Sequence, residues 1–125
     1  MAPNDNFSLA RKSAVVPGAG NGIGRAISLA FAEAGAAVAC VDLDVKSADA
    51  TATVITKKGG RALPLQCDVA VEADVERTAK TIVAELTGIR ILVNGAAGYD
   101  PNGTVLDLTL SEWNRYLRSM LAVRF

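Results

Sequence analysis

The chain has 125 residues, with 13 basic and 13 acidic side chains and therefore a formal net charge of zero. This balance argues against nucleic acid and anionic membrane surfaces as partners. The sequence contains no histidine, which excludes Ser-His-Asp and Cys-His catalysis and argues against a zinc site, so we predict no metal site. A chain of this length predicts one domain, residues 1–125.

The first six residues are polar, and no apolar stretch approaches the roughly 18 residues that a membrane span requires. We therefore expect a cytoplasmic protein. Cys40 and Cys67 fall at the ends of predicted strands. In a reducing compartment we expect both to be buried free thiols and not to form a disulfide.

Short apolar runs alternate with segments of helical periodicity along the whole chain. The predicted strands are residues 13–17, 36–41, 61–67 and 89–93. The first predicted helix covers residues 22–34, and Asp44 or Ser47 begins a second that ends at the Lys57-Lys58-Gly59-Gly60 run. A third ends at Gly88, residues 99–108 form a loop, and the Thr109-Leu110-Ser111-Glu112 capping box begins the last helix.

Each predicted helix has one apolar face. The first presents Ile23, Ile27, Ala30, Phe31 and Ala34; the second Ala48, Ala52 and Ile55; the third Val71, Val75, Ala79, Ile82, Val83 and Leu86; the last Trp113, Tyr116, Leu117, Met120 and Leu121.

Four strands alternating with helices predict an α/β fold with right-handed crossovers. The expected architecture is a Rossmann-type doubly wound parallel sheet with strand order 3-2-1-4, between two helical layers. A core built from Ala, Val, Leu and Ile suits such a sheet, since half of the residues are hydrophobic and only 5% are aromatic. Pro64 lacks an N–H donor, which places the third strand at an edge.

Glycines at positions 18, 22 and 24 follow the first strand. In a strand-turn-helix unit, such glycines allow a tight turn, close approach of a phosphate to main-chain N–H groups and close helix-strand packing. The helix that begins there has unsatisfied N–H groups and a positive dipole end, which attract a diphosphate. A structural turn is the alternative interpretation.

Asp42 ends the second strand, 24 residues after Gly18. An acidic side chain there can accept hydrogen bonds from both ribose hydroxyls of an adenosine and repels a 2′-phosphate. No basic residue stands at Ala19, Gly20, Asn21 or Leu43. The pattern therefore favours NAD over NADP, although a solvated acid at a strand end is the alternative.

With these motifs, residues 13–125 resemble the N-terminal, cofactor-binding half of the short-chain dehydrogenase/reductase family. The glycine turn Gly18-Ala19-Gly20-Asn21-Gly22-Ile23-Gly24 matches the family's turn, with Pro17 in place of a threonine. Asp42, followed by Leu43, matches the acidic residue of members that prefer NAD.

The resemblance implies three further cofactor contacts. Cys67-Asp68-Val69 corresponds to the segment whose Asp side chain and following backbone hold the adenine ring, although an Asp before a helix is also an ordinary cap. Asn94-Gly95-Ala96-Ala97 corresponds to the family's Asn-Asn-Ala-Gly segment, which lines the cofactor cleft. Asn94 either stiffens this cleft or simply closes a turn.

The family's catalytic serine and Tyr-x-x-x-Lys pair have no counterpart among residues 1–125, so no catalytic residue is predicted here. Met120 occupies the position of an asparagine in the family's proton relay, and neither Tyr99 nor Tyr116 substitutes for the missing tyrosine. We expect a chain that ends before the catalytic segment and is inactive alone.

Three functions remain open at this point. The chain is the NAD-binding portion of an oxidoreductase acting on alcohol or carbonyl carbons, a non-catalytic NAD-binding or protein-interaction module, or a remnant without cofactor binding. The apolar stripe of the 109–125 helix, without a partner in the chain, predicts a homo-oligomer or a docking partner.

Overall fold

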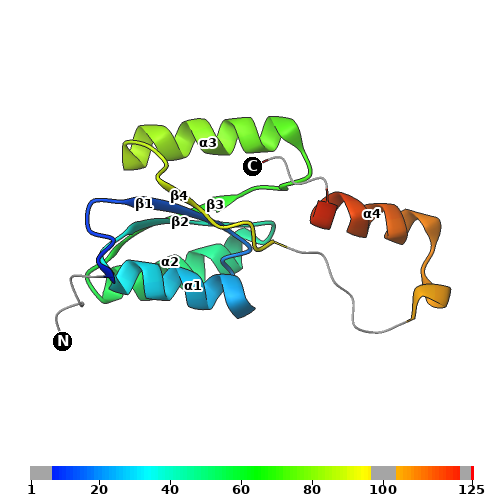
Figure 1. Cartoon of the computed structure of the whole chain (residues 1–125), viewed down its shortest axis with the longest axis horizontal. Coiled ribbons are helices and arrows are strands. Elements are labelled where there is room, and N and C mark those ends of the chain that lie inside the picture. Colours follow the sequence, from blue (N-terminus) through cyan, green and yellow to red (C-terminus); the bar gives the residue numbers. More distant parts are fainter. Residues whose placement is uncertain (1–6, 97–103, 122–124) are drawn as a thin grey trace.

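The computed structural model describes residues 7–96, 104–121 and 125 (Figure 1). The elements, in chain order, are β1 (Ser13–Pro17), α1 (Gly22–Glu33), β2 (Ala37–Asp42), α2 (Val45–Lys57), β3 (Arg61–Gln66), α3 (Glu72–Leu86), β4 (Ile91–Leu92), the 3-10 turn η2 (Val105–Asp107) and α4 (Leu110–Leu121).

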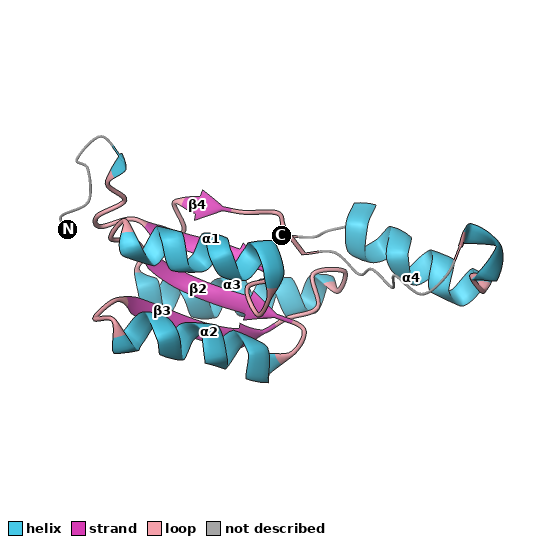
Figure 2. Cartoon of the chain, turned by 90° about the horizontal axis from the view of Figure 1, so that it is seen from below, coloured by secondary structure: helices cyan, strands magenta, loops and turns pink. Residues whose placement is uncertain are grey.

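The four strands form one parallel sheet in the order β3-β2-β1-β4. α1 and α2 cover one face of the sheet and α3 covers the other, while α4 lies to one side of these layers (Figures 1 and 2). The predicted three-layer α/β/α fold and its strand order are confirmed. β3 is an edge strand, as predicted from Pro64.

The core has two halves, one on each face of the sheet. Because successive side chains of a strand point to opposite faces, Val16 packs in the half beneath α1 and α2, whereas Val15 packs in the half beneath α3. All five residues of β1 are buried, since β1 lies inside the sheet between β2 and β4. Cys40 and Cys67 are buried free thiols, as expected.

The buried face of α1 differs from the predicted one. Ile23 is 79% exposed and Ala30 is also exposed, whereas Gly24 and Ser28 are buried. A Cβ on Gly24 would lie only 2.1 Å from the Gly18 carbonyl oxygen, so this side of the helix lies directly against the turn after β1. The hydrophobic pattern missed this face because its two buried residues are not apolar.

The buried face of α3 is confirmed at Val75, Ile82 and Leu86 and wrong at Val71 and Val83, both of which are exposed. Val71 precedes the helix as its N-cap residue. Buried Thr78 completes the face instead of these valines, and its hydroxyl hydrogen-bonds to the Cys67 thiol. A polar side chain can be buried there because it has a partner.

The N-cap residue of α2 is Asp44, the first of the two predicted caps. The Asp44 carboxylate accepts a hydrogen bond from the Lys46 N–H at 3.0 Å, and the Ser47 hydroxyl donates to that carboxylate at 2.7 Å. Ala48, Ala52 and Ile55 are buried, as predicted.

β4 covers only residues 91–92 instead of the predicted 89–93. It pairs with β1 alone among the described strands, although the N–H groups of Arg90 and Val93 continue the ladder to Ser13 and Val15, each at 3.0 Å. The predicted 99–108 loop contains the turn η2 in its described part.

The capping box that begins α4 is confirmed. Thr109 accepts a hydrogen bond from the Glu112 N–H at 3.2 Å, and the Glu112 carboxylate accepts one from the Thr109 N–H at 2.7 Å. No helix in the described part of the chain is long and apolar enough to cross a membrane.

Replacing Gly24 by alanine tests the contact between α1 and β1. Alanine favours a helix interior over glycine by about 1 kcal/mol, but its Cβ would overlap the Gly18 backbone. We expect Gly24→Ala to lower the free energy of unfolding by about 2 kcal/mol net, measured by urea denaturation. The control is Gly95→Ala, whose Cβ would come no closer than 3.8 Å to another group. Equal stabilities of the two variants would contradict this packing.

Candidate cofactor-binding site

A cavity of about 340 Å³ opens at the carboxyl ends of the strands. All of the predicted site residues except Gly20 and Asn94 line it: Gly18, Asn21, Gly22, Ile23, Gly24, Asp42, Leu43, Asp68, Val69, Gly95 and Ala96. Val41, Cys67 and Ser119 also line it and were not predicted. The first two adjoin predicted residues at strand ends, whereas no sequence signal indicated Ser119 of α4.

The N-terminus of α1 lies at this cavity. Asn21 is the N-cap residue and makes no side-chain capping bond, and the helix has no acidic residue in its first turn. The first backbone bond joins the Arg25 N–H to the Asn21 carbonyl at 3.2 Å, so the N–H groups of Gly22, Ile23 and Gly24 have no acceptor within the helix. Every other described α-helix has a capping side chain or an acidic first turn. α1 thus presents unneutralised donors to an anion.

The glycines of the turn have separate structural roles. Gly18 has φ +78° and allows the turn to approach Ala96, whose Cα would lie 3.1 Å from a Cβ on Gly18. Gly24 allows α1 to contact this turn, as described above. Gly22 has φ +55°, and a Cβ on it would meet nothing within 4 Å. The space above Gly22 is therefore open to a ligand.

Asp42 is fixed at the end of β2 by two backbone donors. Its Oδ2 accepts the Gly20 N–H at 2.9 Å and its Oδ1 accepts the Asp44 N–H at 3.0 Å. Each carboxylate oxygen can accept a further hydrogen bond, so the side chain retains acceptor capacity for a hydroxyl pair. Gly20 does not line the cavity, but a Cβ there would lie 2.7 Å from Asp42 Oδ2 and 2.4 Å from the Ser47 Cβ. Only glycine fits between these groups.

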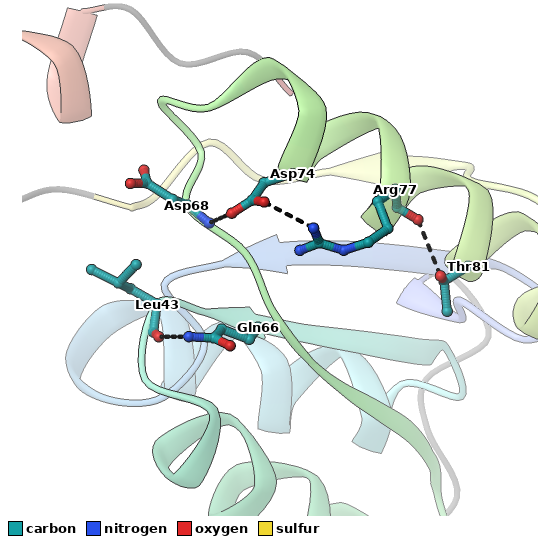
Figure 3. Close-up of polar contacts among 6 residues, drawn as sticks. All are labelled: Leu43, Gln66, Asp68, Asp74, Arg77 and Thr81. Carbon is teal, nitrogen blue, oxygen red and sulfur yellow. Dashed lines mark hydrogen bonds and ion pairs between the residues drawn. The ribbon is translucent and has the colours of Figure 1, made fainter.

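Asp68 and Val69 form the wall of the cavity beyond β3. Asp68 is not the cap of α3; its Oδ1 accepts the Ala70 N–H at 3.0 Å, in a turn before the helix. Its Oδ2 has no protein partner among the described residues. Figure 3 shows the Asp68 carboxylate turned away from Asp74, on the side where Leu43 also lies.

The segment after β4 approaches the glycine turn from the other side. Gly95 and Ala96 line the cavity, and the Gly95 N–H donates to the Val93 carbonyl at 3.1 Å. Asn94 is exposed and does not line the cavity. Ala97 and Tyr99 lie outside the described residues.

A second cavity, of about 710 Å³, lies at the opposite end of the sheet, where the strands begin. It is the larger of the two, but none of the predicted site residues lines it. Ligands of parallel α/β sheets bind at the carboxyl ends of the strands, where helix N-termini also point. The smaller cavity is therefore the candidate site.

A parallel sheet of order 3-2-1-4, a glycine turn before an uncapped helix and a carboxylate at the end of the second strand define a Rossmann-type nucleotide-binding class of protein. The model of the family described as short chain dehydrogenase matches residues 12–123. The chain belongs to the short-chain dehydrogenase family.

Individual relatives agree with this assignment. The chain is 34% identical over 115 residues to a 7alpha-hydroxysteroid dehydrogenase of Escherichia coli strain K12, covering 92% of this chain and 44% of that protein. It is 38% identical over 120 residues to a D-threitol dehydrogenase of Mycolicibacterium smegmatis, covering 96% and 46%. The chain spans about half the length of these curated relatives, in agreement with the predicted correspondence to one half of the family's chain.

Solved structures show the same fold. One, described as a 7 alpha-hydroxysteroid dehydrogenase complexed with NADH and 7-oxo glycochenodeoxycholic acid, has a TM-score of 0.86 at 32% identity and covers 98% of this chain and 47% of its own. A short-chain type dehydrogenase/reductase from Mycobacterium marinum has a TM-score of 0.81 at 36% identity, covering 92% and 45%.

The two buried thiols, Cys67 in the cavity wall and Cys40 in the core under α1 and α2, test how tightly the protein is packed at and near this site. Burial raises the pKa of Cys40 to about 11, so at pH 8 roughly one molecule in a thousand carries the reactive thiolate. Burial also raises the pKa of Cys67, against the opposing hydrogen bond from Thr78. We expect both thiols to react with a disulfide reagent at least about 100-fold more slowly at pH 8 in the native protein than in urea.

The rate for Cys40 should rise as the pH approaches 11, because the thiolate fraction grows with pH up to the pKa. The Cys40→Ala and Cys67→Ala variants assign the two rates. Fast, urea-independent labelling of Cys40 at pH 8 would contradict its burial.

Proposed function

We propose that the chain is the NAD-binding portion of an oxidoreductase that transfers hydride between nicotinamide and an alcohol or carbonyl carbon. The observation that carries this proposal is the uncapped N-terminus of α1 beside the fixed Asp42 carboxylate, at one cavity. The NADH complex of the structural relative supports the class of cofactor. When bound, the cofactor would supply the nicotinamide that exchanges hydride.

The residues present fit such a group at each of its parts. The N–H groups of Gly22, Ile23 and Gly24 would hold the diphosphate, because Gly22 leaves the space beside them open. Asp42 would accept both hydroxyls of the adenosine ribose.

The adenine would lie at Asp68 and Val69. Asp68 Oδ2, which has no partner among the described residues, is an acceptor, and the Val69 N–H is a donor. Together they match a base edge that carries an amino group beside a ring nitrogen acceptor.

The same geometry favours NAD over NADP. Two hydrogen bonds hold the Asp42 carboxylate in place, and the Asp44 carboxylate, held by Lys46 and Ser47, follows two residues later. Hydrogen bonding to Ser47 and to the Lys46 N–H lowers the pKa of Asp44, so it stays charged at neutral pH. A 2′-phosphate there would meet two negative charges without a basic residue at positions 19–21 or 43 to balance them.

The chain by itself is proposed to bind the cofactor without catalysing hydride transfer. The family's tyrosine acts as a general acid and base with a lysine four residues later, whereas Met120 follows Tyr116 at that spacing. Substrate and reaction direction belong to the whole enzyme. A cytoplasmic location stays a prediction from the sequence.

NAD at 100 times its dissociation constant should stabilise the folded chain by about 2.7 kcal/mol, which raises the melting temperature by about 10 °C. The same concentration of NADP should give little shift. Differential scanning fluorimetry with both dinucleotides measures this. No shift with millimolar NAD would refute the proposed function.

The Asp42→Asn variant separates the carboxylate charge from its shape. It should weaken NAD binding roughly tenfold, since it loses a charged acceptor, and should narrow the difference between NAD and NADP. Asp49→Asn, which removes an exposed carboxylate from α2, is the matched control and should behave like the unmodified chain. An unchanged NAD preference in Asp42→Asn would place the discrimination elsewhere.

We also propose that a second copy of the chain covers α4 and the open edge of β4. Trp113, Leu117 and Met120 are 45%, 38% and 56% exposed on one helix, and among the described strands β4 pairs on one side only, with β1. Exposed apolar stripes and free strand edges favour association. Sedimentation velocity should show a dimer or larger species that Trp113→Glu shifts to monomer. A monomer at all concentrations would contradict it.

A further inference from the structure

A short chain of polar contacts lies behind the adenine side of the candidate site (Figure 3). The Asp74 carboxylate, in the first turn of α3, accepts the backbone N–H of Asp68 through Oδ2 at 3.2 Å. Its Oδ1 accepts from the Arg77 guanidinium at 2.9 Å. The Thr81 hydroxyl in turn donates to the Arg77 carbonyl at 3.0 Å. Neither Asp74 nor Arg77 lines the cavity.

The contact with Asp74 determines where the Asp68 segment points. The Asp68 backbone is tied to α3 on one side, and its carboxylate extends to the other side, away from Asp74 (Figure 3). The turn is closed by the Ala70 N–H on Asp68 Oδ1 and by the Val71 N–H on the Asp68 carbonyl, each at 3.0 Å. Among the described residues no protein group bonds to Oδ2 of Asp68, and its carboxylate lies on the side away from Asp74 (Figure 3).

We propose that Asp74, with Arg77 behind it, is a positioning residue for recognition of the adenine base. The inference rests on the proposed function and adds a role for two residues outside the cavity. Because the Asp74 carboxylate accepts a hydrogen bond from the Asp68 N–H, it holds this backbone segment in place. The acceptor of Asp68 and the donor of Val69 then keep a fixed position relative to each other. That placement distinguishes adenine from a base of the same shape with the opposite polar edge.

Hydrogen bonding to the Asp68 N–H and to Arg77 lowers the pKa of Asp74, so its carboxylate is charged at neutral pH. The side chain is only partly covered, at 30% exposed, and Arg77 is 63% exposed. An exposed ion pair of this kind contributes little to global stability. Its loss should therefore affect the local segment more than the fold.

The experiment compares NAD with nicotinamide hypoxanthine dinucleotide, in which a carbonyl and a ring N–H replace the amino group and the ring nitrogen acceptor of adenine. The unmodified 125-residue chain should bind NAD about 10-fold more tightly, measured by isothermal titration calorimetry. In Asp74→Ala this ratio should fall to about 1, mainly because NAD binding weakens. Asp74→Asn keeps an oxygen acceptor for the Asp68 N–H and should retain most of the ratio.

Glu76→Gln is the matched control, since it removes an exposed carboxylate from the same helix, and should leave the ratio unchanged. Amide hydrogen exchange at Asp68 gives a second readout without ligand: the N–H should be protected in the unmodified chain and in Asp74→Asn, and exchange faster in Asp74→Ala.

The outcomes separate the two proposals. If Asp74→Ala leaves the ratio of the two affinities unchanged, including the case in which the binding of both dinucleotides weakens equally, the positioning role alone is overturned. Failure of the unmodified chain to bind either dinucleotide would overturn the proposed function and this inference together.

Discussion

The contact between Gly24 and the backbone at Gly18 is the constraint on which the site depends. Because Gly24 has no side chain, α1 can begin directly above the end of β1. Its first N–H groups are thereby brought to the carboxyl edge of the sheet. If a side-chain methyl group on residue 24 pushed the helix outward, its N-terminal N–H donors would move away from that edge. The geometry proposed to bind the diphosphate is therefore a consequence of packing within the chain.

The second wall of the site is also fixed by the protein itself. Asp42 joins the β1–α1 turn, through Gly20, to the β2–α2 turn, through Asp44. The same carboxylate that would accept ribose hydroxyls thus ties together the two turns that form the site. Preorganisation of this kind lowers the ordering cost of binding. Asp42 therefore has a structural role and a proposed binding role. Asparagine, which removes the charge and keeps the side-chain shape, separates the two roles better than a substitution that removes the side chain.

Much of the fold and the grouping of the site residues could be predicted from the sequence. Strand order followed from the alternation of apolar runs, and the glycines and Asp42 marked strand ends that a parallel sheet brings to one edge. The errors have a common cause. Ile23 and Val83 were assigned to buried faces because they are apolar, whereas the buried positions belong to Gly24 and Thr78. Gly24 has no Cβ, and the Thr78 hydroxyl is paired with the Cys67 thiol. Neither residue contributes to a pattern of apolar residues in the sequence.

Hydrogen bonds between side chains and backbone groups elsewhere in the chain could not be predicted from the sequence, for a related reason. The sequence left two interpretations of Asp68 open, as an adenine contact or as a helix cap. No sequence pattern could show that the backbone N–H of Asp68 donates a hydrogen bond to the Asp74 carboxylate in the first turn of α3. The first turn of α3 carries Glu72 and Asp74, whose negative charges offset the positive end of the helix dipole. The first turn of α1 has no acidic residue and no capping side chain. In the proposed site, this difference distinguishes the helix end that would attract an anion from the one that would support the base. Charge placement at helix ends, more than the glycine motif alone, thus supports the proposal that the diphosphate and the adenine of one dinucleotide lie at two different turns.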